Sequence, residues 1–255
     1  MKKILIYLLS IGVFGVASIA NSQTIRIGTE GAYPPWNNIN SAVDLEEAFD
    51  GTRLSVLKDG EHFCNLHLPL PGKHMVLNSL AALSLCDLLG VEREYLVKGL
   101  ESFQGVQRRF EKVATYNGVE IYDDYAHHPS EVIATLQAAR QLMANKEGKL
   151  VVCFQPHRYS RLQHLMDEFA ESFDNADFLY LMPVYSAGEA PITGVNHWRL
   201  YRDLNLGAEK VSVLESNSIE ECRELILPEL KSGDVLLTMG AGHITRMGRE
   251  IATDN

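Results

Sequence analysis

The chain has 255 residues, of which 46% are hydrophobic, and this is enough material for one large or two small domains with buried cores. Its 23 basic and 33 acidic residues give a net charge of -10 without any basic run, so nucleic acid is excluded as an expected partner. The four cysteines lie far apart and form no Cys-x-x-Cys pair, which argues against a disulfide framework and against a metal site.

Residues 1–23 have the pattern of a secretory signal peptide. The charged "MKK" precedes an apolar stretch from Ile4 to Ala20, and the small and polar "ANSQ" follows. The apolar stretch is slightly shorter than the roughly 20 residues that a membrane-spanning helix needs. An uncleaved anchor is the alternative, and the pattern favours a cleaved signal and a periplasmic or exported protein.

Residues 24–42 have a different character. The segment "TIRIGTEGAYPPWN" is typical of a strand that leads into a turn, and this turn carries Tyr33 and Trp36. It resembles the beginning of a periplasmic solute-binding protein for polar amino acids, in which aromatic residues of the turn meet the ligand. The resemblance ends by about Ser41.

Residues 43–110 form the next predicted region. The segment "FDGTRLSVLKDGEHFCNLHLPLPG" alternates apolar and polar residues between glycine-containing turns, as antiparallel strands do. The helix predicted from His74 to Gly90 is apolar almost all round, so it must be buried on most sides. The short strands before it are too little to cover it, which predicts that part of its packing partner is missing.

Residues 111–255 alternate strand-like and helix-like segments, which predicts an α/β, Rossmann-like domain with a parallel-rich sheet. The strand-like runs are "VEIYDD", "KLVVCFQP", "DFLYLMPV", "KVSVLES" and "DVLLTMGA". Pro129 fits a first helical position, and two pairs fit capping boxes at helix starts, Ser160 with Gln163 and Ser218 with Glu221.

The segment "IYDDYAHHPSE" concentrates polar side chains at the end of a predicted strand. Ligands of such sheets bind outside the carboxyl ends of the strands, which predicts a ligand cleft here. Adjacent histidines diverge in direction, so His127 and His128 make a poor joint metal site. A helix cap within a solvated loop is the alternative to ligand binding.

The segment "FQPHRYSRLQ" follows the next strand and places His157, Arg158 and Arg161 around a helix start. Two guanidinium groups beside unpaired helix N–H groups favour a seat for a carboxylate or a phosphate. The alternative is a solvated face on which the arginines pair with neighbouring acids.

Six motifs together resemble the C-terminal half of a Mur ligase, over the region from about Val43 to the end. In order, they are "HMVLNSLAAL", "GVQRRFE", "YDDYAHHPSEV", "FQPHRYSR", "VYSAGEAPITGV" and "GDVLLTMGAGHI". The "HRYSR" and "DDYAHHP" forms are most similar to the branch that adds L-alanine during peptidoglycan precursor synthesis. The resemblance implies a Rossmann-like C-terminal domain preceded by a remnant of the central domain over residues 43–110.

The resemblance also implies roles for individual residues. In the family, ATP with Mg²⁺ converts a sugar carboxylate to an acyl phosphate, and the amine of an amino acid attacks it. Three positions match nucleotide contacts: Asn78 for the adenine, Arg109 for the phosphates and Asp124 for the ribose. Five positions match the wall that receives the amino acid: Tyr125, His127, His157, Arg158 and Arg161.

Two departures from the family pattern change the functional expectation. Met75 stands where the family has an asparagine, and no Gly-Lys pair is followed by the Ser or Thr of a phosphate-binding loop. We therefore expect a truncated ligase that is inactive alone, without this loop and the UDP-sugar domain. The leader predicts an exported protein, whereas the ligase lineage predicts a cytoplasmic one. A gene fusion, a relic or a sequence junction would explain this conflict. The alternatives are an exported amino-acid-binding module and a non-catalytic partner of a separate ligase N-terminal half.

Overall fold

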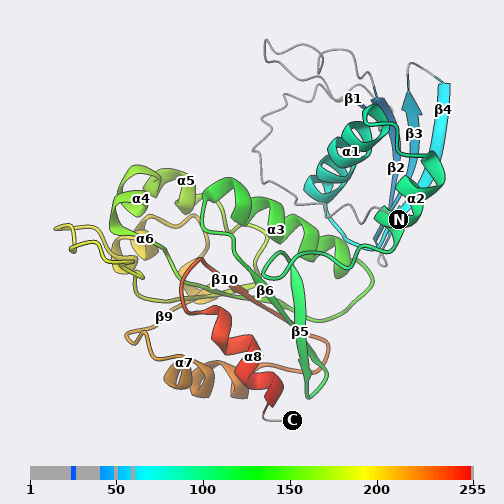
Figure 1. Cartoon of the computed structure of the whole chain (residues 1–255). Coiled ribbons are helices and arrows are strands. Elements are labelled where there is room, and N and C mark those ends of the chain that lie inside the picture. The colour runs from blue at the N-terminus through cyan, green and yellow to red at the C-terminus, as the bar shows by residue number, and fades with distance from the viewer. Residues whose placement is uncertain (1–23, 27–40, 49–50, 59–60, 254–255) are drawn as a thin grey trace. The chain divides into compact units, whose positions relative to one another are not determined.

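The computed structural model describes residues 24–26, 41–48, 51–58 and 61–253 (Figure 1). The predicted signal peptide and the turn with Tyr33 and Trp36 lie outside these residues. The chain divides into two compact units, residues 1–104 and 105–255, so residues 105–110 cluster with the second unit. Within the described ranges, no helix is long and apolar enough to cross a membrane.

The first unit contains a four-stranded antiparallel sheet and two helices, which confirms the predicted antiparallel strands. The strands lie side by side in chain order: β1 (Thr24–Arg26), β2 (Ser41–Ala48), β3 (Gly51–Lys58) and β4 (Glu61–Leu68). The helices are α1 (Lys73–Leu88) and α2 (Arg93–Glu101). The strand expected at the start of the solute-binding-like stretch is β1, which pairs with β2 of this sheet.

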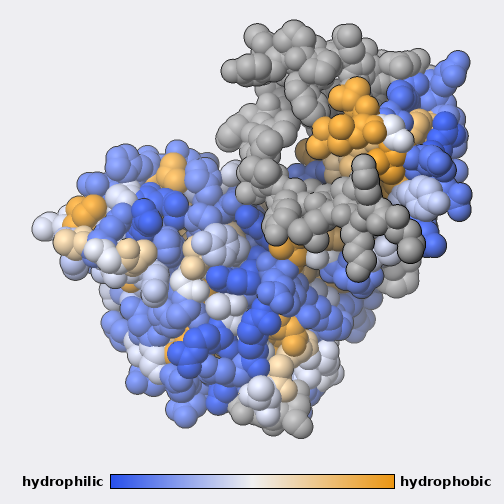
Figure 2. Space-filling view, viewed as in Figure 1, coloured by the Kyte–Doolittle hydropathy of each residue, from blue (hydrophilic) through white to orange (hydrophobic). Residues whose placement is uncertain are grey.

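Helix α1 is covered on one side. Val76, Leu80 and Leu83 are buried in one cluster with the apolar residues of β3 and β4. Leu88 and Leu89, in contrast, are 54% and 73% exposed, and Figure 2 shows apolar side chains gathering over this helix. The strands therefore bury one side of the helix, and the apolar residues at its C-terminal end are exposed.

The second unit is built on a six-stranded sheet with the order β5-β6-β10-β7-β8-β9. Only β5 runs antiparallel to its neighbour, which confirms the predicted α/β fold with a parallel-rich sheet. The strands are β5 (Glu111–Tyr116), β6 (Val119–Asp124), β7 (Leu150–Phe154), β8 (Phe178–Leu181), β9 (Val211–Val213) and β10 (Val235–Met239).

Six α-helices and two short 3-10 helices complete the described part of this unit. The α-helices are α3 (Pro129–Leu142), α4 (Tyr159–His164), α5 (Met166–Ala170), α6 (His197–Asp203), α7 (Ile219–Ile226) and α8 (Thr245–Thr253). The 3-10 helices are η2 (Ala208–Lys210) and η3 (Leu227–Glu229). Pro129 begins α3 as predicted, and the Ser218 hydroxyl accepts a hydrogen bond from the Glu221 N–H at the start of α7 (3.3 Å).

Strand β5 was not predicted from the sequence. It forms a hairpin with β6 through Asn117 and Gly118, which have φ values of 49° and 80°. Two consecutive left-handed residues are the hallmark of a tight hairpin turn, and Asn-Gly is its preferred sequence. The Asn-Gly pair was thus a usable signal for the missing strand.

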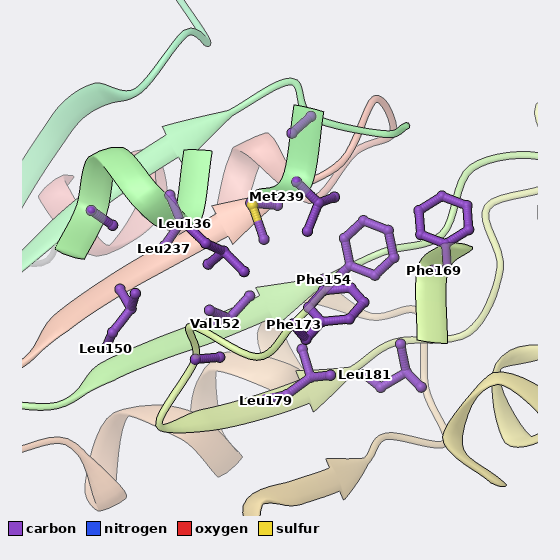
Figure 3. Close-up of a cluster of buried hydrophobic side chains, with 14 of the residues drawn as sticks. Leu136, Leu150, Val152, Phe154, Phe169, Phe173, Leu179, Leu181, Leu237 and Met239 are labelled. Carbon is purple, nitrogen blue, oxygen red and sulfur yellow. The ribbon is translucent and has the colours of Figure 1, made fainter. Parts of the chain in front are cut away.

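The helices cover both faces of the sheet with apolar side chains. Figure 3 shows one face, where Leu136 of α3 lies over Val152 of β7, and the Phe154 ring packs 5.6 Å and 5.1 Å from the rings of Phe169 and Phe173. On the other face, Ile121 and Leu236 of the sheet are buried in one cluster with Met247 of α8 and apolar residues of α7. A sheet buried on both faces explains why its central strands are continuous apolar runs.

The strand order makes neighbouring connections diverge at the carboxyl edge of the sheet. Strand β10 lies between β6 and β7, and these three strands run parallel. The chain continues from β6 and β7 into α3 and α4 on one face, and from β10 into α8 on the other (Figure 1). Such a divergence of neighbouring connections marks the usual ligand site of open α/β sheets.

Candidate functional site

The loops after β6 and β7 bring three of the predicted site residues together. The His127 ring lies 6.0 Å from the His157 ring and 5.0 Å from the Tyr125 ring, centroid to centroid. His157 also stacks on Tyr185, at 5.5 Å with an interplanar angle of 17°. The carboxyl edge of the sheet therefore carries a group of rings, in which His127 meets its neighbours edge to face and His157 stacks on Tyr185.

The tautomer of His127 follows from its hydrogen bonds. Its Nδ1 lies 2.8 Å from the Tyr125 carbonyl oxygen, which can only accept, so Nδ1 must carry the proton. Burial lowers the pKa of His127, although the Tyr125 carbonyl and the Glu131 carboxylate oppose this shift. At neutral pH the ring is therefore neutral, with its lone pair on Nε2.

His157 has the opposite arrangement. Its Nδ1 lies 3.3 Å from Nη1 of Arg161, and because a guanidinium only donates, Nδ1 accepts and the ring proton is on Nε2. Burial and the positive charge of Arg161 lower the pKa of His157 to about 4. Arg161 therefore already contacts one neutral side chain of the protein, that of His157.

The start of α4 differs from the prediction. Arg158 is the exposed residue before this helix and has a φ of 70°, and Ser160 lies inside the first turn, so the predicted capping box of Ser160 and Gln163 is wrong. The Glu189 carboxylate instead accepts from the Ser160 N–H (3.0 Å) and from its hydroxyl (2.6 Å). An acid of the chain therefore already occupies this predicted anion seat at the helix start.

Asp124 is buried, with 3% of its surface exposed, and both of its carboxylate oxygens are engaged. They accept hydrogen bonds of 2.7 Å from the N–H groups of Phe110 and Ala126. Burial raises the pKa of this carboxyl to about 6, against the opposing effect of the two amides. A ribose would have to share these oxygens, and its contact with Asp124 stays a prediction.

Arg109 lies beside the loop after β6. Its Nη1 is 3.6 Å from a Glu131 carboxylate oxygen, and the other Glu131 oxygen accepts from the N–H groups of His127 and His128 (3.1 and 3.2 Å). The main-chain N–H groups of the two histidines thus take part in the helix cap that was the alternative interpretation. Glu131 was not selected from the sequence, although a glutamate in the first turn of a helix is a known capping signal.

Two further features of the site were missed. The Arg108 guanidinium lies 4.7 Å from the centre of the Tyr125 ring and donates to the Gly240 carbonyl oxygen (2.6 Å). Gly242 follows in the same turn, where an added Cβ would lie 2.5 Å from Oε1 of the buried Gln155. The glycines of the segment "MGAGH" allow this close approach, and their spacing was a usable signal for it.

Comparison with known proteins assigns the family. A model of the Mur ligase, glutamate ligase domain, matches residues 108–242, which is more than half of the chain. The chain belongs to the Mur ligase family. The match contains both strand ends of the site and excludes Asn78, which is exposed on α1 of the first unit.

Individual Mur ligases extend the similarity. The UDP-N-acetylmuramate–L-alanine ligase of Rickettsia bellii is 42% identical over 188 residues, which are 72% of this chain and 38% of that protein. The enzyme of the same name from Bartonella henselae is 42% identical over 210 residues, or 82% of this chain and 43% of its own length. The chain thus spans less than half the length of these relatives.

A solved structure agrees with these matches. The UDP-N-acetylmuramate-alanine ligase of Thermotoga maritima superposes with a TM-score of 0.67 at 30% identity, covering 83% of this chain and 45% of that one. The second unit therefore has the fold of a Mur ligase C-terminal domain.

Possible metal-binding side chains lie apart from one another in the described residues. Across the described part of the chain, no three His, Cys, Asp or Glu side chains group closely enough to hold a metal ion. Mg²⁺ at nucleotide sites is usually held by one or two carboxylates together with phosphates and water, so its binding by this chain stays a prediction from the family.

Proposed function

We propose that this chain carries the amino-acid-binding part of a UDP-N-acetylmuramate:L-alanine ligase, which forms an amide bond at the expense of ATP during peptidoglycan precursor synthesis. The observation that supports the proposal is the proximity of His127, His157 and Arg161 to one another at the carboxyl edge of the sheet. The names of the relatives support L-alanine as the amino acid.

The geometry suggests how these side chains serve the reaction. An amino acid arrives as an ammonium ion, and its nitrogen must lose a proton before it can attack an activated carboxylate. Neutral His127 has an Nε2 lone pair that can accept this proton. The guanidinium groups of Arg158 and Arg161 supply the positive charge that attracts the carboxylate.

The nucleotide side of the site is less complete. When bound, ATP supplies the phosphoryl group that activates the sugar carboxylate. Arg109 and Asp124 are the residues of the second unit that we assign to it, and the adenine contact of Asn78 stays a separate prediction. Because the sequence has no Gly-Lys-Ser or Gly-Lys-Thr, we propose that the 255-residue chain alone does not complete the ligation.

An NMR titration with L-alanine tests the proposal directly. We expect resonances of His127, His157 and Arg161 to shift with a Kd of about 1 mM, because one charge-assisted site without a closing domain offers little more. Arg158→Lys should weaken binding, since an ammonium lacks the planar fork that holds two oxygens. Arg202→Lys on α6 is the control, and shifts confined to other surfaces would refute the assignment.

An ADP-release assay with UDP-N-acetylmuramate and L-alanine tests the second part of the proposal. We expect no turnover by the chain alone above the blank without enzyme. Addition of a separate ligase N-terminal half is the informative second arm, because turnover only in the mixture would identify such a half as a partner. Fractionation of the expressed protein tests the signal peptide independently.

A further inference from the structure

The loop after β8 folds back on the start of α4. Tyr185 pairs with His157 as an isolated parallel bridge, in which the Tyr185 N–H donates to the Pro156 carbonyl oxygen and the Arg158 N–H donates to the Tyr185 carbonyl oxygen (both 2.8 Å). This pairing extends the β7–β8 alignment into the site. It also brings the following residues of the loop, up to Glu189, next to the first turn of α4.

Glu189 holds this turn at two points. Its two carboxylate oxygens accept from the N–H and the hydroxyl of Ser160, at 3.0 and 2.6 Å. A tight turn precedes it, with Ala187 and Gly188 at φ values of 51° and 86° and a hydrogen bond from the Glu189 N–H to the Ser186 carbonyl oxygen (3.0 Å). The hydrogen bonds from Ser160 lower the pKa of Glu189, so it is a carboxylate at neutral pH.

Arg158 and Arg161 flank the serine that Glu189 contacts. Arg158 has a left-handed φ of 70°, which is unfavourable for an arginine and persists only when its surroundings hold it. Arg161 reaches His157 from the same turn, with its Nη1 3.3 Å from the ring and 3.4 Å from the carbonyl oxygen. A six-residue helix has little stability of its own, so an outside contact is needed to fix these positions.

We propose that Glu189 is a positioning residue, which fixes the first turn of α4 so that Arg158 and Arg161 can bind the carboxylate of the amino acid. Glu189 does not touch the substrate itself. The inference rests on the proposed function for its ligand, but the positioning of the arginines can be measured without any ligand.

Two substitutions separate geometry from charge. Glu189→Gln keeps both contacts, because the amide oxygen can accept from the Ser160 N–H while the amide NH₂ donates to the hydroxyl. Glu189→Ala removes both. Glu224→Ala, on an exposed position of α7, is the matched control, and thermal unfolding of every variant verifies that it folds.

The first measurement needs no ligand. At pH 7 we expect the Arg161 Nε–Hε and His157 ring resonances to move in Glu189→Ala and to stay close to their original positions in Glu189→Gln. Unchanged resonances in Glu189→Ala would overturn the proposal, as would equal displacement in both variants, which would make charge the cause. This outcome is independent of whether L-alanine binds.

The second measurement is an L-alanine titration of the same proteins. Loss of two hydrogen bonds to a charged group should weaken binding about tenfold in Glu189→Ala, and Glu189→Gln should bind within about threefold of the original chain. Tighter binding by Glu189→Ala would instead identify Glu189 as a competing anion and refute a positioning role. If the original chain does not respond to L-alanine, the proposed function fails, and the ligand-free resonances still decide the role of Glu189.

Discussion

Replacement of Asp124 by Asn tests how the loop after β6 is held. The carboxylate accepts hydrogen bonds of 2.7 Å from the N–H groups of Phe110 and Ala126, and an asparagine can accept only one of them. The other amide would face the NH₂ group of the new side chain. A buried donor without an acceptor costs about 1 to 3 kcal/mol.

A second effect opposes this loss. Burial raises the pKa of Asp124 from 3.8 to about 6, and a shift of that size corresponds to about 3 kcal/mol of preference for the neutral form. The stabilisation that this preference gives is full below pH 3.8 and is lost as the pH rises through about 6. Asn carries no charge at any pH, so the two effects nearly cancel at pH 8 and the lost hydrogen bond dominates near pH 4.

Urea unfolding followed by circular dichroism at pH 4.5 and pH 8 measures the difference between the two proteins. We expect Asp124→Asn to be close to the original chain at pH 8 and destabilised by about 1 to 3 kcal/mol at pH 4.5. Faster hydrogen exchange of the Phe110 amide should accompany the change. A destabilisation that shrinks as the pH falls would refute the reasoning, because the amides would then outweigh burial and hold the pKa low.

Three further predictions concern neighbouring parts of the molecule. Gly242→Ala should destabilise the second unit by about 1 to 3 kcal/mol in urea unfolding, because the new Cβ would lie 2.5 Å from the side-chain oxygen of Gln155; an unchanged midpoint would contradict this. Glu131→Gln should lower the pKa of His127 in an NMR titration, because the carboxylate raises this pKa. A higher pKa in the variant would contradict that role of Glu131. Limited proteolysis should cut first within residues 43–104, where α1 leaves apolar residues exposed, and leave a fragment that begins near residue 105; equal resistance throughout would exclude it.

The central architecture could be predicted because strongly apolar runs have few alternatives. The five parallel strands of the second unit each coincide with a predicted run, and a parallel sheet places all their carboxyl ends at one edge. That rule places His127 and His157 at the same edge, and the strand order β6-β10-β7 brings them close. Strand β5 escaped prediction because it lies at the edge of the sheet and alternates weakly between partly buried and exposed residues.

The contacts that hold the loops could not be predicted in the same way. Glu189 lies 29 residues from Ser160 in sequence, and no local pattern links the two. The expected capping box at Ser160 failed because Arg158 adopts a left-handed φ and the helix starts two residues earlier than that box requires. A motif of serine and glutamine at the right spacing gives only the local preference, and a tertiary carboxylate overrode it.

Acidic and basic side chains of the site contact different partners. Glu131, Asp124 and Glu189 all accept hydrogen bonds from main-chain N–H groups at or near the carboxyl edge of the sheet. Because these acids hold main-chain groups, the side chains of Arg158 and Arg161 are left to meet the carboxylate of the proposed amino acid. An acidic chain with a net charge of -10 can thus present a site suited to negative charge. The same division implies that removing the carboxylate of Glu131 or Glu189 should loosen a loop first and weaken ligand binding only as a consequence.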